Sequence, residues 1–70
     1  MKITINGKDT LIGENPERTI GSLLEELEVP QRLYVTVEQN GDILDRAAYE
    51  TAPVNEGDVI EFLYFMGGGR

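Results

Sequence analysis

Two Asn-Gly pairs, Asn6-Gly7 and Asn40-Gly41, restrict most strongly what this chain can fold into. Asn-Gly suits a type I′ turn because both central residues of that turn need a positive φ, and such turns join antiparallel strands. Apolar and polar residues alternate on either side of each pair, so that Ile3 and Ile5 share one strand face. The sequence therefore predicts two hairpins, built from strands at residues 1–6 and 8–12 and at residues 33–38 and 42–44.

Between the two hairpins the spacing of apolar residues changes and predicts one helix. Its apolar residues recur at helical spacing and form one stripe, made of Ile20, Leu23, Leu24 and Leu27. Thr19 is a suitable N-cap, because its hydroxyl can accept from a free backbone N–H of the first turn. Pro30 disfavours helix at Val29, so we expect the helix to end near Glu28.

The last third of the chain predicts a short turn and a final strand. Residues 46–51 are too few for an independent helix, so a single turn is expected there. Glu56-Gly57-Asp58 is typical of a tight turn, and the strand predicted after it spans Val59–Phe65. The order of elements indicates an α+β roll, with a mixed sheet of about five strands and one main helix packed on one face.

The composition excludes most enzyme classes. The 70 residues suffice for one domain, for which we expect residues 1–66 with a flexible tail at 67–70. Without Cys or His the chain lacks thiolate nucleophiles, imidazole bases and the usual zinc ligands, so no bound metal or cofactor is expected.

The charge and hydropathy of the chain also bear on its partners and location. A net charge of −7 opposes nucleic-acid binding, and no apolar run could span a bilayer. We expect a cytoplasmic protein.

The chain ends in Phe65-Met66-Gly67-Gly68-Gly69-Arg70, so that an apolar strand leads directly into three glycines. Glycine has no Cβ, which lets such a tail lie extended in the narrow channel of another protein. The run also allows one terminal carboxylate to visit several partners in turn.

Together with VTVEQNGDILDR (Val35–Arg46) and EGDVIEF (Glu56–Phe62), this tail resembles the ThiS/MoaD superfamily of ubiquitin-like sulfur carriers. The first stretch matches the family's V-x-V-x-x-N-G-x-I-x-x-R run. The resemblance implies a β-grasp fold whose first and last strands pair in parallel. It also implies a carrier that is not itself an enzyme: the terminal glycine is adenylated and becomes a thiocarboxylate that donates sulfur for thiazole formation in thiamin biosynthesis.

The same resemblance implies a set of partners. These are an E1-like (ThiF-like) adenylating enzyme that uses ATP, a thiazole synthase (ThiG-like) and a sulfur donor such as a cysteine desulfurase. Arg70 departs from the family pattern, because the carboxylate to be activated belongs to Gly69. Either a metalloprotease removes Arg70 or the residue was added in cloning, and the sequence leaves both open.

Partner docking is expected on the last strand. Alternation places Ile60, Phe62 and Tyr64 on one face and the remaining residues on the other. One helix covers one face only, so an apolar patch should stay exposed near the tail. The candidate docking residues are Val59, Glu61, Leu63, Phe65 and Tyr34, with Val35 as a further neighbour and Asp58 as a second rim charge beside Glu61.

Two other readings remain open at this point. The chain could carry sulfur for molybdopterin or for cysteine or homocysteine synthesis, since those carriers share the glycine tail. It could also be a β-grasp interaction module that never uses its terminus. For Arg46, within the matching stretch, an ion pair with Asp42, Asp45 or Glu50 is expected.

Overall fold

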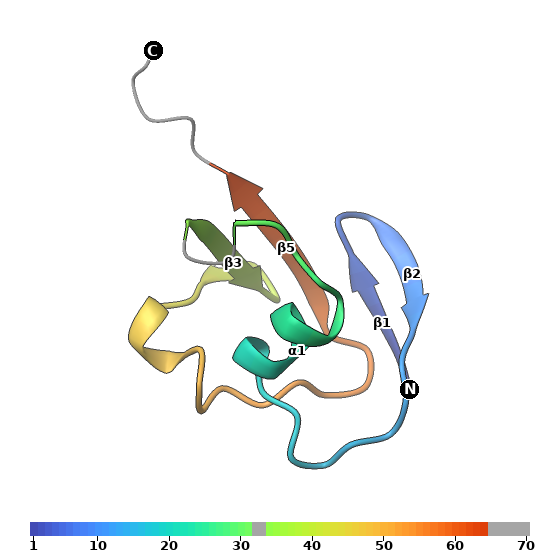
Figure 1. The fold of residues 1–70 in the computed structure, drawn as a ribbon. Coiled ribbons are helices and arrows are strands. Elements are labelled where there is room, and N and C mark those ends of the chain that lie inside the picture. The colour runs from blue at the N-terminus through green and yellow to red at the C-terminus, as the bar shows by residue number, and fades with distance from the viewer. Residues whose placement is uncertain (32–33, 65–70) are drawn as a thin grey trace.

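The computed structural model describes residues 1–31 and 34–64, and it confirms the predicted α+β class (Figure 1). Within these residues, a single sheet is covered on one face by one helix. In chain order the elements are β1 (Lys2–Ile5), β2 (Lys8–Leu11), α1 (Ile20–Glu26), β3 (Val35–Gln39), β4 (Asp42–Ile43), a 3₁₀ turn η1 (Arg46–Ala48) and β5 (Val59–Tyr64).

The sheet has the order β2-β1-β5-β3-β4, which places the last strand at its centre. β5 pairs in parallel with β1, with Thr4 opposite Val59 and Ile5 opposite Ile60, and antiparallel with β3. The parallel pairing expected from the family resemblance is therefore present. β5 consequently runs away from the end of the molecule where β1 begins and delivers its last residue at the opposite end (Figure 1).

Both Asn-Gly pairs form the predicted hairpin turns, with φ of 50° at Asn6 and 54° at Asn40 followed by glycines with positive φ. Each asparagine also contacts the central strand. The Asn6 Oδ1 accepts from the Phe62 N–H at 2.9 Å, and the Asn40 Oδ1 accepts from the Val59 N–H at 2.8 Å. The two turns therefore hold β5 as well as reversing the chain.

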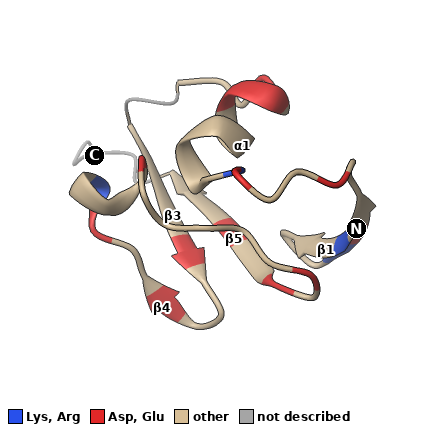
Figure 2. Cartoon of the chain, turned by 90° about the horizontal axis from the view of Figure 1, so that it is seen from below, with Lys and Arg blue, Asp and Glu red and all other residues tan. Residues whose placement is uncertain are grey.

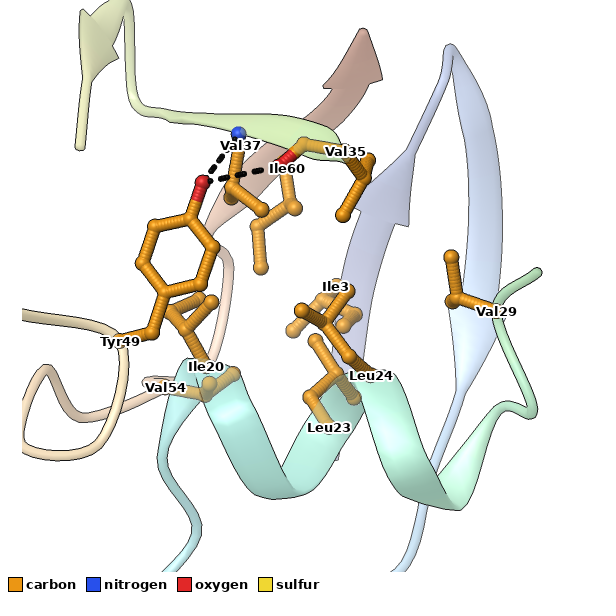
Figure 3. Packing of buried hydrophobic residues seen from close by; sticks show 10 residues of the cluster. All are labelled: Ile3, Ile20, Leu23, Leu24, Val29, Val35, Val37, Tyr49, Val54 and Ile60. Atoms are coloured by element: carbon orange, nitrogen blue, oxygen red, sulfur yellow. Dashed lines mark hydrogen bonds between the residues drawn. The ribbon is translucent and has the colours of Figure 1, made fainter. Parts of the chain in front are cut away.

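The core lies between α1 and the sheet (Figure 3). Apolar side chains from the helix and the three central strands fill it, and the residues that are at most 2% exposed are Ile3, Ile20, Leu23, Leu24, Val35, Val37 and Ile60. Burial of side chains of this size contributes about 1.5–3 kcal/mol each, so the domain depends on this one cluster. The predicted helix stripe supplies three of these core residues, Ile20, Leu23 and Leu24.

Buried Tyr49 bonds to the outer edge of β3 where no described strand pairs with it. β4 pairs there only with Glu38 and Gln39. The Tyr49 hydroxyl accepts from the Val37 N–H at 2.9 Å and donates to the Val35 carbonyl at 3.3 Å (Figure 3). Two backbone groups that would otherwise be buried without partners are thus satisfied.

Several boundaries differ from the predicted ones. β2 ends at Leu11 and β4 at Ile43, each one residue early, while β3 begins at Val35 and extends to Gln39. Leu33, the predicted start of β3, and Phe65, the predicted end of β5, lie outside the described residues.

The largest difference lies at the end of α1, which stops at Glu26 with Leu27 as its C-cap. Glu28 follows in the left-handed region with φ of 54°, and its N–H donates to the Glu25 carbonyl. The Val29 N–H donates to the Leu24 carbonyl, which completes a Schellman-type ending. Glycine is usual at the Glu28 position, so the sequence carried no sign of this ending. Leu27 is only half-buried as a result.

We predict that Glu28→Gly stabilises the domain by about 0.5–1 kcal/mol, because glycine adopts a positive φ without the Cβ penalty. Chemical denaturation should show a higher midpoint. The matched variant Glu25→Gly places the same change inside the helix and should lose about 1 kcal/mol. Equal destabilisation by both variants would contradict the left-handed helix ending.

Candidate functional site

The site is the end of β5, where the strand leads toward the glycine run. β3 pairs with β5 along one edge as far as Val35 opposite Tyr64, and the Asn6 side chain continues the other edge beyond β1. The Tyr64 hydroxyl donates to the Pro30 carbonyl at 3.0 Å. β5 is therefore held through its last described residue. The predicted tail residues Gly67, Gly68, Gly69 and Arg70 lie outside the described part of the chain, as does Phe65.

Alternate residues of β5 point to opposite faces of the sheet, and the two sets differ in how far they are buried. Ile60 is fully buried beneath α1, and Phe62 packs against the core beside it. Val59, Glu61 and Leu63 point to the face that α1 leaves uncovered, where Val59 is 45% exposed and the other two are half-buried. The set that faces away from the helix is thus the one predicted for docking.

Ile43 extends this uncovered face beyond β5, because it lies opposite Glu38 on β4, and it is 64% exposed. Tyr34, just before β3, is 73% exposed. Ile43 was missed because its two-residue strand has too little alternation to show which face it takes. The inclusion of Val35 was wrong, since its side chain is fully buried in the core.

Two carboxylates lie opposite one another on the uncovered face. Glu38 on β3 pairs in register with Glu61 on β5, and both are half-buried. The ion pairs between described residues involve other groups, namely the N-terminus with Glu14, Lys2 with Asp9 and Arg18 with Glu26. Figure 2 shows acidic positions on β3, β4 and β5. Like charges directly opposite destabilise a strand pair, so this face suits a cationic partner group.

Asp58 was wrongly predicted as a rim charge, because it is buried and fully engaged. Its carboxylate accepts from the Gln39 and Asn40 side-chain amides, each at 3.0 Å, and from the Asn55 N–H at 2.8 Å. The residue therefore fixes the turn before β5 to the second hairpin.

Arg46 has a structural contact that the sequence did not suggest. Its Nη2 donates to the Val35 carbonyl at 2.8 Å, and its guanidinium lies 5.3 Å from the centre of the Tyr49 ring. The arginine of the family-like run thus supports the start of β3, which pairs with the end of β5.

Neither a metal site nor a membrane span emerges from the described residues. Over 1–31 and 34–64, no three acidic side chains are grouped so that they could hold a metal ion. The helix within these ranges is too short and too polar to cross a membrane.

Comparison with known proteins connects this geometry to one family. Residues 2–69 match the model of the ThiS family. The crystal structure of the thiamine biosynthesis protein (ThiS) from Geobacter metallireducens superposes with a TM-score of 0.91 at 46% identity, covering 99% of this chain and all of that one.

Two curated relatives match over nearly the whole chain. The sulfur carrier protein ThiS of Bacillus subtilis is 33% identical over 67 residues, which are 96% of this chain and 98% of that protein. A thiazole synthase of Paramagnetospirillum magneticum is 39% identical over 69 residues, or 99% of this chain. The chain spans only 20% of the length of that synthase.

We predict that Glu38→Gln stabilises the isolated domain by about 0.2–1 kcal/mol at low salt, because it removes the repulsion across the strand pair. The gain should shrink as salt screens the two charges. Glu17→Gln, which makes the same charge change in an exposed loop, is the control for net charge. Thermal unfolding at two salt concentrations measures both, and equal shifts would rule out a specific repulsion between Glu38 and Glu61.

Proposed function

The chain belongs to the ThiS family, and from this we propose that it is a sulfur carrier in thiamine biosynthesis. The observation that supports the proposal best is that the family match extends from the first strand to Gly69, the last glycine of the run. The relative from Bacillus subtilis, which bears the sulfur carrier name, is matched over 98% of its own length.

The reaction we propose takes place on the carboxylate of Gly69 once Arg70 is absent. A carboxylate oxygen attacks the α-phosphorus of ATP, which releases pyrophosphate and leaves an acyl adenylate. The terminal sulfur of a persulfide on a donor such as a cysteine desulfurase attacks the carbonyl carbon and displaces AMP, which gives an acyl disulfide. A thiol, which this Cys-free chain cannot supply, then attacks the donor's sulfur, forms a new disulfide with it and releases the thiocarboxylate. That sulfur is passed to the forming thiazole, and an oxygen from water or from the acceptor takes its place, so that the carrier regains its carboxylate.

The chain itself supplies position rather than catalysis in this scheme. It has no Cys or His, and its glycines have no side chains. The terminal main-chain carboxylate is therefore the group that reacts. β3 holds one edge of β5 as far as Tyr64, and β1 with the Asn6 side chain holds the other as far as Phe62, so the chain leaves the sheet from a fixed point. Preorganisation of this kind lowers the entropy lost when a partner takes the carboxylate.

We propose a thiazole synthase as the acceptor enzyme. A synthase from Paramagnetospirillum magneticum contains a region similar to this chain within one longer protein. Joining carrier and synthase in one chain raises their effective concentration, which favours proteins that act on each other. The other proposed partners are a ThiF-like adenylating enzyme and, where Arg70 belongs to the natural chain, a metalloprotease that removes it.

The uncovered sheet face is the surface on which we propose that the adenylating enzyme docks. Ile43 and Val59 are large apolar side chains exposed there, Tyr34 is exposed just before β3, and Glu38 and Glu61 add negative charge. An enzyme that binds ATP needs cationic groups for the phosphates, so a basic surface around its active site would complement this face.

The test is the intact mass of the protein after incubation with ATP, a ThiF-like enzyme and a sulfur donor. A chain ending at Gly69 should gain the mass that corresponds to replacing one oxygen by sulfur, whereas the chain that keeps Arg70 should not. A variant ending at Gly67 serves as a folded control and should stay unmodified. No mass change in the Gly69 form with an active enzyme would reject the carrier function in favour of an interaction module.

A further inference from the structure

A groove on the helix side of β5 is not part of the docking face described above. It has a volume of about 620 Å³ and lies between the β1–β2 hairpin, the segment after α1 and the end of β5. Its apolar walls include Ile5, Leu27, Val29 and Phe62. Leu27, the C-cap of α1, packs against the core with part of its side chain and lines the groove with the rest.

The groove is already formed without a partner, because two hydrogen bonds within the chain hold its walls in place. The Asn6 side chain holds the Phe62 N–H, and the Tyr64 hydroxyl holds the Pro30 carbonyl. An occupant would therefore gain apolar contact without first breaking these hydrogen bonds. Grooves of this size and character readily take an apolar group.

One cation stands at the rim. Lys8 lines the groove, and the ion pairs among the described residues leave it without an acidic partner. The opposite face of the sheet carries Glu61 on β5 and Glu38 beside it on β3. The sign of the charge therefore changes across β5, which favours a partner that brings a carboxylate to one side and a cation to the other.

The position of the groove indicates which protein fills it. Tyr64 forms part of its wall and is also the last described residue before the tail. Gly69 follows Tyr64 by five positions, and five extended residues span at most about 17 Å. An enzyme that encloses the Gly69 carboxylate must therefore lie close to the end of β5, within reach of both the groove and the docking face. A second copy of this chain is disfavoured, since both copies carry a net charge of −7.

We propose that the groove receives an apolar side chain of the adenylating enzyme, and that a neighbouring carboxylate of that enzyme pairs with Lys8. This proposal rests on the carrier function above. Together with the docking face it would fix the orientation of the carrier, because a rotated carrier would present a charge of the wrong sign on each side of β5.

Steady-state kinetics of pyrophosphate release test the proposal, with the carrier ending at Gly69 as the varied substrate. Lys8→Glu should raise KM about tenfold at low salt while kcat stays unchanged, as expected for binding that is equal in ground and transition states. Lys2→Glu makes the same charge change in the same hairpin but at the end remote from the tail. It also breaks the exposed ion pair with Asp9, so thermal unfolding should first show an intact fold, and its KM should then match that of the unaltered carrier.

Two further variants address the groove itself. Thr10→Phe fills it from the exposed strand β2 and should also raise KM about tenfold, with a thermal unfolding curve that shows an intact fold. Because the chain has no Cys, Thr10→Cys introduces a unique thiol, which the enzyme should protect from alkylation. Gly13→Cys is the control, since a side chain at Gly13 meets open space, and its thiol should stay reactive.

The outcomes separate the two proposals. Unchanged KM for Lys8→Glu and Thr10→Phe, or an unprotected thiol at position 10, would overturn the groove proposal and leave the carrier function standing. Normal activation followed by impaired thiazole formation would also overturn it, because the occupant would then come from the synthase. Failure of the unaltered Gly69 form to release pyrophosphate would overturn both.

Discussion

The parallel pairing of β1 with β5 is the constraint on which the rest of the structure depends. Parallel neighbours cannot be joined by a tight turn, so the chain between them must cross over one face of the sheet. Here that crossover contains α1, which covers the core, and the second hairpin, which closes the other side of β5. The same pairing places the last strand at the centre of the sheet, where it has a neighbour on each edge.

Local chemistry made part of this fold predictable. Each Asn-Gly pair predicted its hairpin because few other residues accept a positive φ at both turn positions. The start of α1 followed from Thr19, whose hydroxyl accepts from the Ser22 N–H. The parallel pairing could not be read in this way, since strand alternation is the same for both directions, and it came from the family resemblance alone.

What the sequence did not predict was decided by tertiary packing. Both faces of β5 carry apolar residues, so only the position of α1 settles that Val59 and Leu63 point outward. The end of α1 was missed because Glu28 occupies a backbone conformation normally taken by glycine. Leu27, which follows Glu26 at this ending, packs against the core only in part and also lines the groove. Asp58 has the composition of a surface charge, and only its three hydrogen bonds explain why it is buried.

The two asparagines that hydrogen-bond to β5 are also sites at which the protein can deamidate. When glycine follows asparagine, the glycine nitrogen can attack the side-chain carbonyl carbon, expel ammonia and form a succinimide, which water opens to aspartate or isoaspartate. At Asn6 and Asn40 this ageing would alter the side chains that bond to the Phe62 and Val59 N–H groups. At Asn40 it would also set a new carboxylate against Asp58, in place of the amide that now donates to it. The turns that guide the chain into its fold thus also limit how long a sample stays homogeneous.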